Sequence, residues 1–261
     1  MARKRDRERR PARRAEPIEP RRRLLVVAEG DVTEREYMNG FVSKCRNPLV
    51  SFDFVGDAGV PMTLVGRAKQ LADAAVEAAQ REQDDYLAFD EVWCLFDRDE
   101  HPHVGEAREM ARANGLKVAM SNPCFELWLV LHLRDNPGMQ HRHAMQRILQ
   151  DLMPGAQLKH IDFEQLIAGY EQAFLRAERI KREAREAGDA LANPSTEVFQ
   201  LTDSIDDEGR LRRASARDRR DQESRAKASA SAQAAFELAE RQQREASVAE
   251  TLDAERDDSD G

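Results

Sequence analysis

Two apolar stretches far apart in the chain each stop at acidic residues, and this pattern constrains the fold most. The run at residues 92–96 is followed by Asp97 and Asp99, and the run at residues 24–28 is followed by Glu29. Continuous apolar runs of this length are typical of strands that are buried on both faces of a parallel sheet. Because ligands of open α/β sheets bind outside the carboxyl ends of the strands, we expect the three acids to meet at one edge.

Strand and helix patterns alternate through the first half of the chain. The predicted strands cover residues 24–29, 50–55, 91–96 and 116–120, and the predicted helices begin near residues 34, 61, 104 and 124. This alternation is typical of an α/β fold with a mostly parallel four-stranded sheet and helices on both faces. After residue 136 the pattern predicts a C-terminal extension of helices and no further strand, with the helices near residues 140–152, 162–187 and 195–205.

Local motifs predict where three of the helices begin. Thr33 and Glu36 have the spacing of a capping box, in which each side chain bonds a free backbone N–H of the first turn. Asn122 stands before a proline, as an N-cap residue does when proline occupies the first helical position. Asn193 and Pro194 repeat that arrangement. We therefore expect helices to start directly after these residues.

The two ends of the chain differ in charge from the middle. Residues 1–23 hold eleven Lys or Arg and four Asp or Glu, whereas residues 203–261 hold eleven and sixteen, so their net charges are +7 and −5. The whole chain carries −8, which leaves −10 on the middle. The basic end either grips phosphates or is a solvated, disordered leader. We expect a basic disordered arm (1–22), an α/β domain (23–135), a helical extension (136–206) and a charged tail, largely disordered or partly helical (207–261).

The sequence carries no signal for a membrane or an oxidising compartment. No apolar run approaches the length that spans a bilayer, and the basic arm lacks the apolar segment of a secretory signal. Three cysteines are an odd number without paired metal-ligand spacing, and each has apolar neighbours. We interpret them as reduced, mostly buried thiols of a cytoplasmic protein with no membrane partner.

Glu29, Asp97 and Asp99 are the residues expected to hold a metal ion. Oxygen ligands suit hard divalent cations, so Mg²⁺ or Mn²⁺ is the expected cofactor, with one or two ions bound. A pair of such ions stabilises the attacking and leaving oxygens in phosphodiester hydrolysis. Gly30 would let a backbone or a phosphate approach closely. The alternative is that these acids are ordinary strand-end and turn residues, because aspartate is common in turns.

A third strand tip adds further candidates. Glu126 follows the predicted fourth strand, in the first turn of a helix, where it can be a ligand, a general base or only a partner of the helix dipole. We interpret Asn122 as a cap rather than a catalytic group, and His132 as a core residue. The candidates for contact with substrate are Gly30, Asn122, His101 and Lys159, although a histidine beside Pro102 is often only an exposed loop residue.

Four segments together resemble the RloB family, which belongs to the wider Toprim-like group. They are Ala-Glu-Gly-Asp-Val-Thr-Glu-Arg-Glu-Tyr at 28–37, Phe-Asp-Arg-Asp-Glu-His at 96–101, Ser-Asn-Pro-Cys-Phe-Glu-Leu-Trp at 121–128 and Asn-Pro-Ser-Thr at 193–196. The resemblance spans roughly residues 22–205. It implies a Toprim-like fold in which Glu29, Asp97 and Asp99 hold Mg²⁺, and a nuclease of bacterial defence against phage, of the abortive-infection kind. Related Toprim effectors work beside an ATPase partner.

The expected function is therefore a metal-dependent nuclease, with Glu29, Asp97, Asp99 and Glu126 as its catalytic residues. By analogy with Toprim toxins, RNA, and tRNA in particular, is favoured over DNA as substrate. The negative charge of the middle opposes nucleic-acid binding, and metal ions, the basic arm or a protein partner would have to offset it. The partners considered are a nucleic acid, an ATPase encoded nearby and a second copy of the chain. The alternative function is a non-catalytic regulatory or scaffold subunit of a defence complex.

Overall fold

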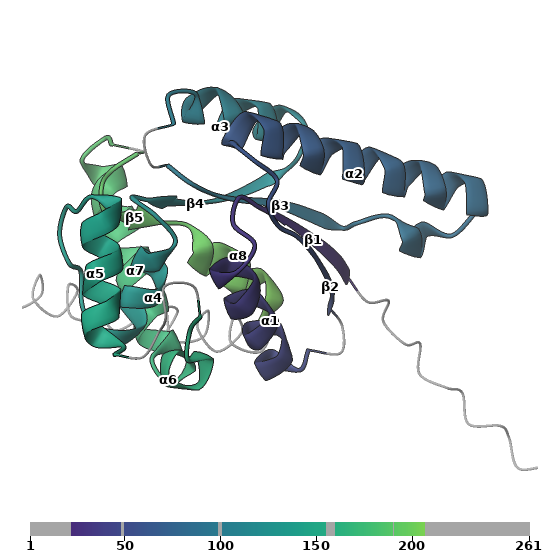
Figure 1. Ribbon diagram of the computed structural model, residues 1–261. Helices are drawn as coiled ribbons and strands as arrows, with labels where there is room; N and C mark the ends of the chain where they lie inside the picture. Colours follow the sequence, from purple (N-terminus) through teal and green to yellow (C-terminus); the bar gives the residue numbers. More distant parts are fainter. Residues whose placement is uncertain (1–21, 48–49, 99–100, 155–159, 190, 207–261) are drawn as a thin grey trace, which may run out of the picture. The chain divides into compact units, whose positions relative to one another are not determined.

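Four parallel strands form the centre of the protein in the computed structural model (Figure 1). The structure describes residues 22–47, 50–98, 101–154, 160–189 and 191–206. The strands are β1 (Arg22–Ala28), β2 (Val50–Val55), β3 (Glu91–Asp97) and β4 (Lys117–Asn122), in the order β2-β1-β3-β4. Each neighbouring pair is parallel, and the register places Asp97 opposite Ser121. The predicted α/β fold is confirmed.

A fifth strand, β5 (Ser195–Thr196), pairs antiparallel with the outer edge of β4. The prediction of no strand after residue 136 was therefore wrong, and the last helix, α8 (Val198–Ile205), begins three residues later than expected. Two residues are too few to show the alternation that identifies a strand in a sequence. The hydroxyl groups of Ser121 and Thr196 lie 2.9 Å apart across this pair, in a fully buried position.

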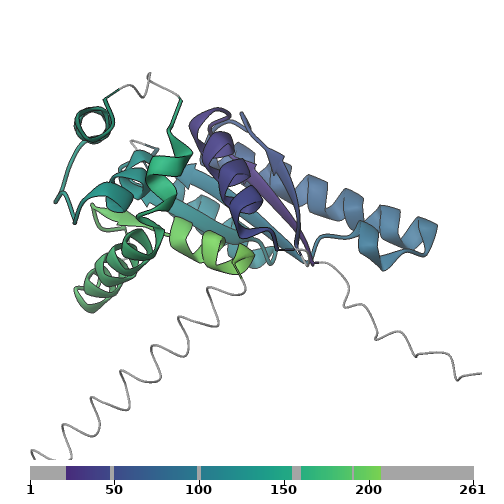
Figure 2. The ribbon, with the colours of Figure 1, turned by 90° about the horizontal axis from the view of Figure 1, so that it is seen from below.

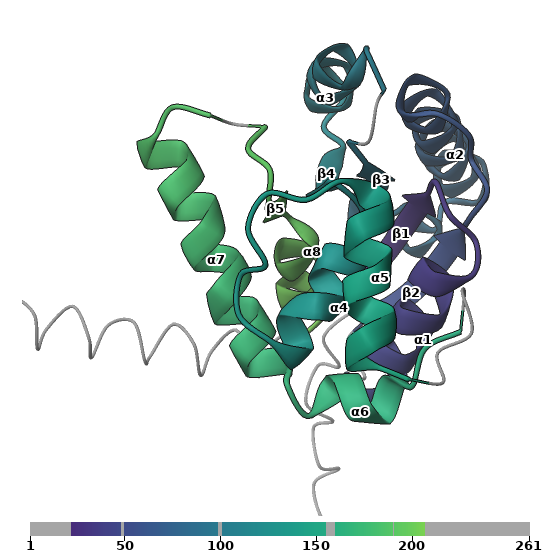
Figure 3. The same ribbon diagram turned by 60° about the vertical axis from the view of Figure 1, so that its left-hand side comes forward.

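Helices cover both faces of the sheet (Figures 1 and 3). On one face lie α2 (Pro61–Glu82) and α3 (Val104–Ala113), and a short 3-10 helix, Asp85–Leu87, follows α2. The other face carries α1 (Thr33–Cys45), α4 (Glu126–Leu133), α5 (Arg142–Leu152), α6 (Phe163–Ile167), α7 (Tyr170–Glu186) and α8. Seen from below, α1 and α8 lie over the strands (Figure 2). None of the described helices is both long and apolar enough to cross a membrane.

The alternating side chains of β1 divide between two hydrophobic cores. Leu24, Val26 and Ala28 pack toward α1 and α4, whereas Leu25 and Val27 pack toward α2 and α3. All five are buried, as expected for a central parallel strand that reads as a continuous apolar run. The strand tip is therefore held on both faces, which fixes the position of the residue that follows it.

The predicted core histidine is confirmed. His132 lies in α4, whose residues from Leu127 to His132 are all buried. Its Nδ1 lies 2.8 Å from the Leu166 carbonyl oxygen, which can only accept, so Nδ1–H donates. Its Nε2, 3.1 Å from the Tyr37 hydroxyl, therefore accepts. Two helices, α1 and α6, are thus tied to α4 through one neutral imidazole ring.

The three predicted helix caps were wrong, although α1 begins within one residue of its predicted start, because at each motif a polar side chain binds a distant segment. Val32, not Thr33, occupies the N-cap position of α1, and Glu36 accepts a hydrogen bond from the Ile161 N–H at 3.0 Å. Asn122 ends β4, and its amide donates to the carbonyl oxygens of residues 191 and 192 at 2.6 and 3.1 Å. Asn193 donates to the Gln140 carbonyl oxygen at 2.8 Å.

The predicted helix at residues 162–187 is two helices, α6 and α7, which are separated near Gly169. A Cβ atom on Gly169 would lie 2.1 Å from the carbonyl oxygen of His132. Only glycine allows this close approach of two backbones, which seats the α6–α7 corner on the end of α4. Helical spacing of apolar residues continues through this corner in the sequence, so it gives no sign of the break.

The chain ends were predicted from charge alone. Residues 1–21 and 207–261, which make up most of the basic arm and the whole charged tail, lie outside the described residues. Arg22 and Arg23, which were counted with the arm's cations, are part of β1 and pair with Glu91 at 3.3 Å and Asp53 at 2.9 Å.

The three cysteines are free thiols, with Cys94 and Cys124 buried and Cys45 partly buried, as expected.

Candidate functional site

Glu29 and Asp97 lie where the strand order reverses. The chain passes from β1 to β2 on one side, and then returns to β3 on the other side of β1. The connections after β1 and β3 therefore leave the sheet in opposite directions, and ligands of doubly wound sheets bind in the crevice between them. The Glu29 N–H bonds the Leu95 carbonyl oxygen at 2.9 Å, and Oε2 of Glu29 accepts from the Asp97 N–H at 3.3 Å. The structure thus brings these two predicted acids together.

Asp97 is a buried carboxyl group among other acids. Asp97 is only 7 % exposed to solvent. Burial raises its pKa well above the ordinary value of 3.8, and the negative charges of Glu126, Glu34 and Glu29 raise the pKa further, whereas Arg142 opposes them. We call Glu29, Glu34, Asp97 and Glu126 the acidic cluster. Its members come from β1, α1, β3 and α4, so segments almost 100 residues apart in the sequence supply charge to one place.

Glu34 is the member that the sequence analysis missed. It lies in the first turn of α1, and burial raises its pKa above 4.5, as do the charges of Glu126 and Glu29. A Cβ atom on Gly30 would lie 2.3 Å from both carboxylate oxygens of Glu34. Gly30 therefore admits this carboxylate, rather than a phosphate, beside the tip of β1. In the sequence, Glu34 stands four residues after Gly30, but it served only to mark where a helix begins.

Glu126, the first residue of α4, is held by the helical extension. Its Oε1 accepts a hydrogen bond from Nε2 of Gln146, on α5, at 3.0 Å. The nearby Cys124 thiol is buried, and burial and then the charges of Glu126 and Asp97 raise its pKa. That thiol is therefore neutral at physiological pH and does not act as a nucleophile. Since α5 also carries Arg142, the extension contributes both a hydrogen-bond donor to Glu126 and a positive charge to the acidic cluster.

His101 also reaches the acidic cluster. Its Nε2 lies 3.2 Å from Oε1 of Glu29, and a carboxylate only accepts, so the imidazole N–H donates. Both side chains are about one quarter exposed, so the pair is open to solvent and to a ligand. The loop that follows β3 thus returns a proton donor to the tip of β1, which makes His101 part of the site rather than an isolated loop residue.

The structure does not assign three of the predicted site residues to this site. Asp99 and Lys159 lie outside the described residues. Asn122 is 2 % exposed, and its side-chain amide is engaged with the backbone before β5. Their assigned roles in metal or substrate binding remain predictions.

The acidic cluster has the donor chemistry of a site for a hard cation. Within the described ranges, no group of three or more His, Cys, Asp or Glu residues is already arranged to hold a metal ion. The carboxylates nevertheless raise one another's pKa values, with Arg142 as the opposing charge. Carboxylate oxygens are the ligands that Mg²⁺ prefers, and a divalent cation would offset this repulsion. Glu29, Glu34, Asp97 and Glu126 therefore fit such an ion by chemistry.

The family model of RloB-like proteins matches residues 24–205. The chain belongs to the RloB-like family. The match covers the sheet, the acidic cluster and the helical extension, so the resemblance noted in the sequence is confirmed over nearly the whole described part. No curated protein and no solved structure matches the chain.

Proposed function

We propose that this RloB-like protein is a metal-dependent nuclease that hydrolyses phosphodiester bonds. The observation that carries the proposal is the buried carboxyl group of Asp97 at the switch point of the sheet, with Glu29, Glu34 and Glu126 around it. Perturbed carboxyl groups that gather in a crevice at the strand tips are typical of functional sites. RNA is the substrate to test first, and a role in defence against phage is supported only by the resemblance.

Different side chains of the site would bind the metal ion and accept the proton. Burial raises the pKa of both Asp97 and Glu34, and these two acids would hold Mg²⁺ or Mn²⁺, together with Glu126 and Asp99. When bound, such an ion lowers the pKa of water and neutralises charge on a phosphate. Glu29 faces His101, whose N–H donates to it. This contact orients the Glu29 carboxylate, which can then accept a proton from the attacking water.

Arg142 and the N-terminal end of α5 would face the substrate. Arg142 acts on both Asp97 and Glu34 through its charge. A guanidinium group can bind two phosphate oxygens at once, so Arg142 would position the phosphodiester against the acidic cluster. The net charge of the whole chain is −8, which makes such local positive charge necessary for a polyanionic substrate.

The test is cleavage of tRNA, other RNA and DNA by the purified protein with Mg²⁺ or Mn²⁺, alone and with the product of a neighbouring ATPase gene. D97N and E34Q should each lower the cleavage rate at least about 100-fold, because each removes a metal ligand without changing the side chain's shape. D90N, at the opposite end of the same strand, and E36Q, on the same helix as Glu34, are matched controls that should retain activity.

Two results would contradict the nuclease proposal. One is that the wild-type protein cuts no substrate under any of these conditions, which would favour the alternative of a regulatory or scaffold subunit. The other is that D97N and E34Q cut as fast as D90N and E36Q. A metal titration followed by calorimetry separates the two parts of the proposal, since D97N should weaken metal binding whether or not a substrate is known.

A further inference from the structure

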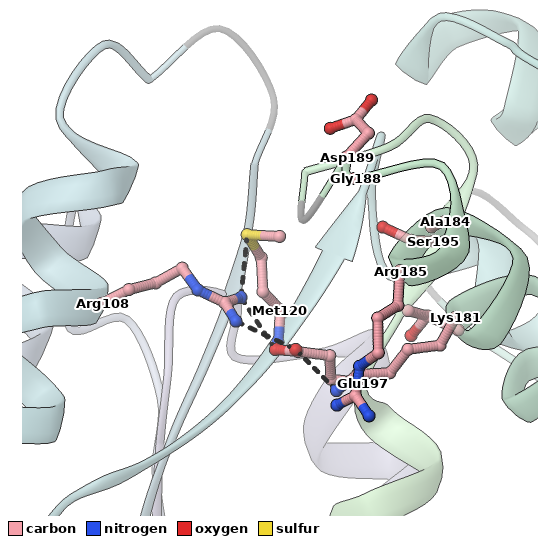
Figure 4. Close-up of a pocket in the computed structure, with 10 residues that line it drawn as sticks. Arg108, Met120, Lys181, Ala184, Arg185, Gly188, Asp189, Ser195 and Glu197 are labelled. Carbon is pink, nitrogen blue, oxygen red and sulfur yellow. Dashed lines mark hydrogen bonds and ion pairs between the residues drawn. The ribbon is translucent and has the colours of Figure 1, made fainter.

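A cavity of about 310 Å³ lies at the β5 edge of the sheet, away from the acidic cluster (Figure 4). Its wall includes Arg108 from α3 and both Lys181 and Arg185 from α7, with Glu197 between them and Asp189 near the loop after α7. Three basic and two acidic side chains give this lining a net charge of +1. The cavity is thus a local exception on a chain whose middle is strongly acidic.

Glu197 fixes two of the three cations in place. Its two carboxylate oxygens accept from Nη1 and Nη2 of Arg108 at 2.9 and 3.0 Å, and Oε1 also accepts from Nζ of Lys181 at 2.8 Å. Burial alone would raise the pKa of Glu197, but the bonds and charges of Arg108 and Lys181 lower it below 4.5. The carboxylate is therefore ionised at neutral pH, and the cations around it are held in position before any ligand arrives.

The cations keep unused capacity to bind an anion. Lys181 has three N–H donors, and Glu197 and Gln200 accept hydrogen bonds from its Nζ at 2.8 and 3.1 Å. Arg185 lies beside Lys181 in Figure 4, and within the described residues its guanidinium has no ion-pair partner. A guanidinium and an ammonium group at one cavity are the donors that bind phosphate oxygens in proteins.

We propose that this cavity, which we call the basic pocket, binds a phosphate group of the nucleic-acid strand. The assignment to a strand rests on the proposed nuclease function, whereas the binding of phosphate does not. Glu197 joins β4 through the hydrogen bond from its N–H to the Met120 carbonyl oxygen, and Met120 pairs with Phe96, next to Asp97 on β3. Strands lie about 4.8 Å apart, so the backbone of Glu197, at the wall of the basic pocket, lies roughly two such spacings from the tip of β3.

That separation matches a strand that extends past the acidic cluster. A nucleic-acid strand advances about 3.4 Å per nucleotide along a helix axis, so roughly 10 Å corresponds to about three nucleotides. The basic pocket would then hold a phosphate a few nucleotides from the bond that is cut. The pocket would raise the affinity for the strand and fix its position along the acidic cluster, without touching the reacting atoms. Arg185 would therefore be a positioning residue.

The first experiment measures binding of inorganic phosphate to the full chain by calorimetry, in EDTA so that no metal site contributes. R185Q should weaken phosphate binding about 10-fold, because Arg185 is the one basic side chain of the pocket whose donors bind no other group in the described part of the chain. R182Q is the matched control on the same helix, since Arg182 is exposed and lies 3.9 Å from Glu186. Equal weakening by R185Q and R182Q, or no phosphate binding by the wild type at millimolar concentrations, would overturn the proposal.

A second experiment distinguishes a strand from a free phosphate ester. Binding of a short single-stranded RNA is measured against salt concentration, again in EDTA. If the strand occupies the pocket, R185Q should weaken RNA binding and reduce the salt slope by about 0.7, the value for one phosphate contact. If R185Q weakens phosphate but leaves RNA binding unchanged, the assignment to the strand is wrong. D97N should keep the phosphate affinity, so a failure of the nuclease proposal is distinguishable from a failure of this one.

Discussion

Asp97, at the end of β3, and Glu197, directly after β5, are buried acids on the two sides of β4, yet their surroundings are opposite. Asp97 is 7 % exposed and Glu197 is 8 % exposed. Other carboxylates raise the pKa of Asp97, whereas Arg108 and Lys181 lower the pKa of Glu197. The difference teaches that burial alone does not identify a functional acid. The charge of Glu197 is balanced by two cations of the protein, whereas Asp97 has three carboxylates around it and Arg142 as the opposing charge.

The sharpest way to break this comparison is to remove Glu197. E197A leaves Arg108, Lys181 and the Met120 N–H without their common partner, which should lower the free energy of unfolding by about 3–4 kcal/mol. Urea denaturation at pH 7 measures the change. E183A removes only an exposed pair on α7, at 3.9 Å from Arg179, and should change stability by less than about 0.5 kcal/mol. Similar losses in the two variants would show that Glu197 is not a buried structural partner.

The buried histidine His132 gives a second contrast, because its contribution to the free energy of unfolding depends on pH. Burial lowers the pKa of His132 from 6.5 to about 4, so protonation favours the unfolded chain. Its contribution to stability is complete above pH 6.5 and is lost as the pH falls toward 4, where the loss reaches about 3 kcal/mol. Unfolding free energies of the wild type and H132N at pH 7 and pH 4.5 test this. The variant should be less stable at pH 7 and should lose less on acidification; parallel curves would contradict the assignment.

D97N should change the free energy of unfolding in the opposite direction to E197A. In EDTA at pH 7 it removes a carboxyl group whose charged form burial and three other carboxylates disfavour, so the free energy of unfolding should rise by about 1–2 kcal/mol. Because the folded-state pKa of Asp97 is raised, protonation favours the folded state. This contribution is complete below the ordinary pKa of 3.8 and is lost as the pH rises through the folded-state pKa. The advantage of D97N in unfolding free energy should therefore shrink as the pH falls, and urea denaturation at several pH values measures it.

The smallest expected effect concerns Gly30 and Glu34. In G30A the added methyl group would meet the Glu34 carboxylate, whose flexible end can move aside, so stability should fall by only about 1 kcal/mol. In an E34A background, the loss of stability caused by G30A should be smaller by about 0.5 kcal/mol, as a double-mutant cycle would measure. Additive effects would show that the two residues are not in contact in solution.

The sequence predicted the meeting of Glu29 and Asp97 because strand patterns and parallel pairing are set by local apolar residues. It could not predict Glu34 as a member of the acidic cluster, since a glutamate in the first turn of a helix is also favoured by the helix dipole. Asn122, Asn193 and Glu36 were assigned to helix caps from their neighbours in the chain. Their actual partners lie 53 to 125 residues away, at a separation that a local motif cannot reveal.

The short strand β5 has a consequence for how the chain can be divided. It covers the outer edge of β4 at Ser121 and Asn122, and the backbone of Glu197 extends that cover to Met120. A fragment ending at residue 135 would keep every parallel strand but present this edge bare. Unpaired strand edges recruit other chains and promote aggregation. The sheet and its helical extension should thus be expressed as one piece, ending no earlier than α8, and a cut at residue 135 should give insoluble protein.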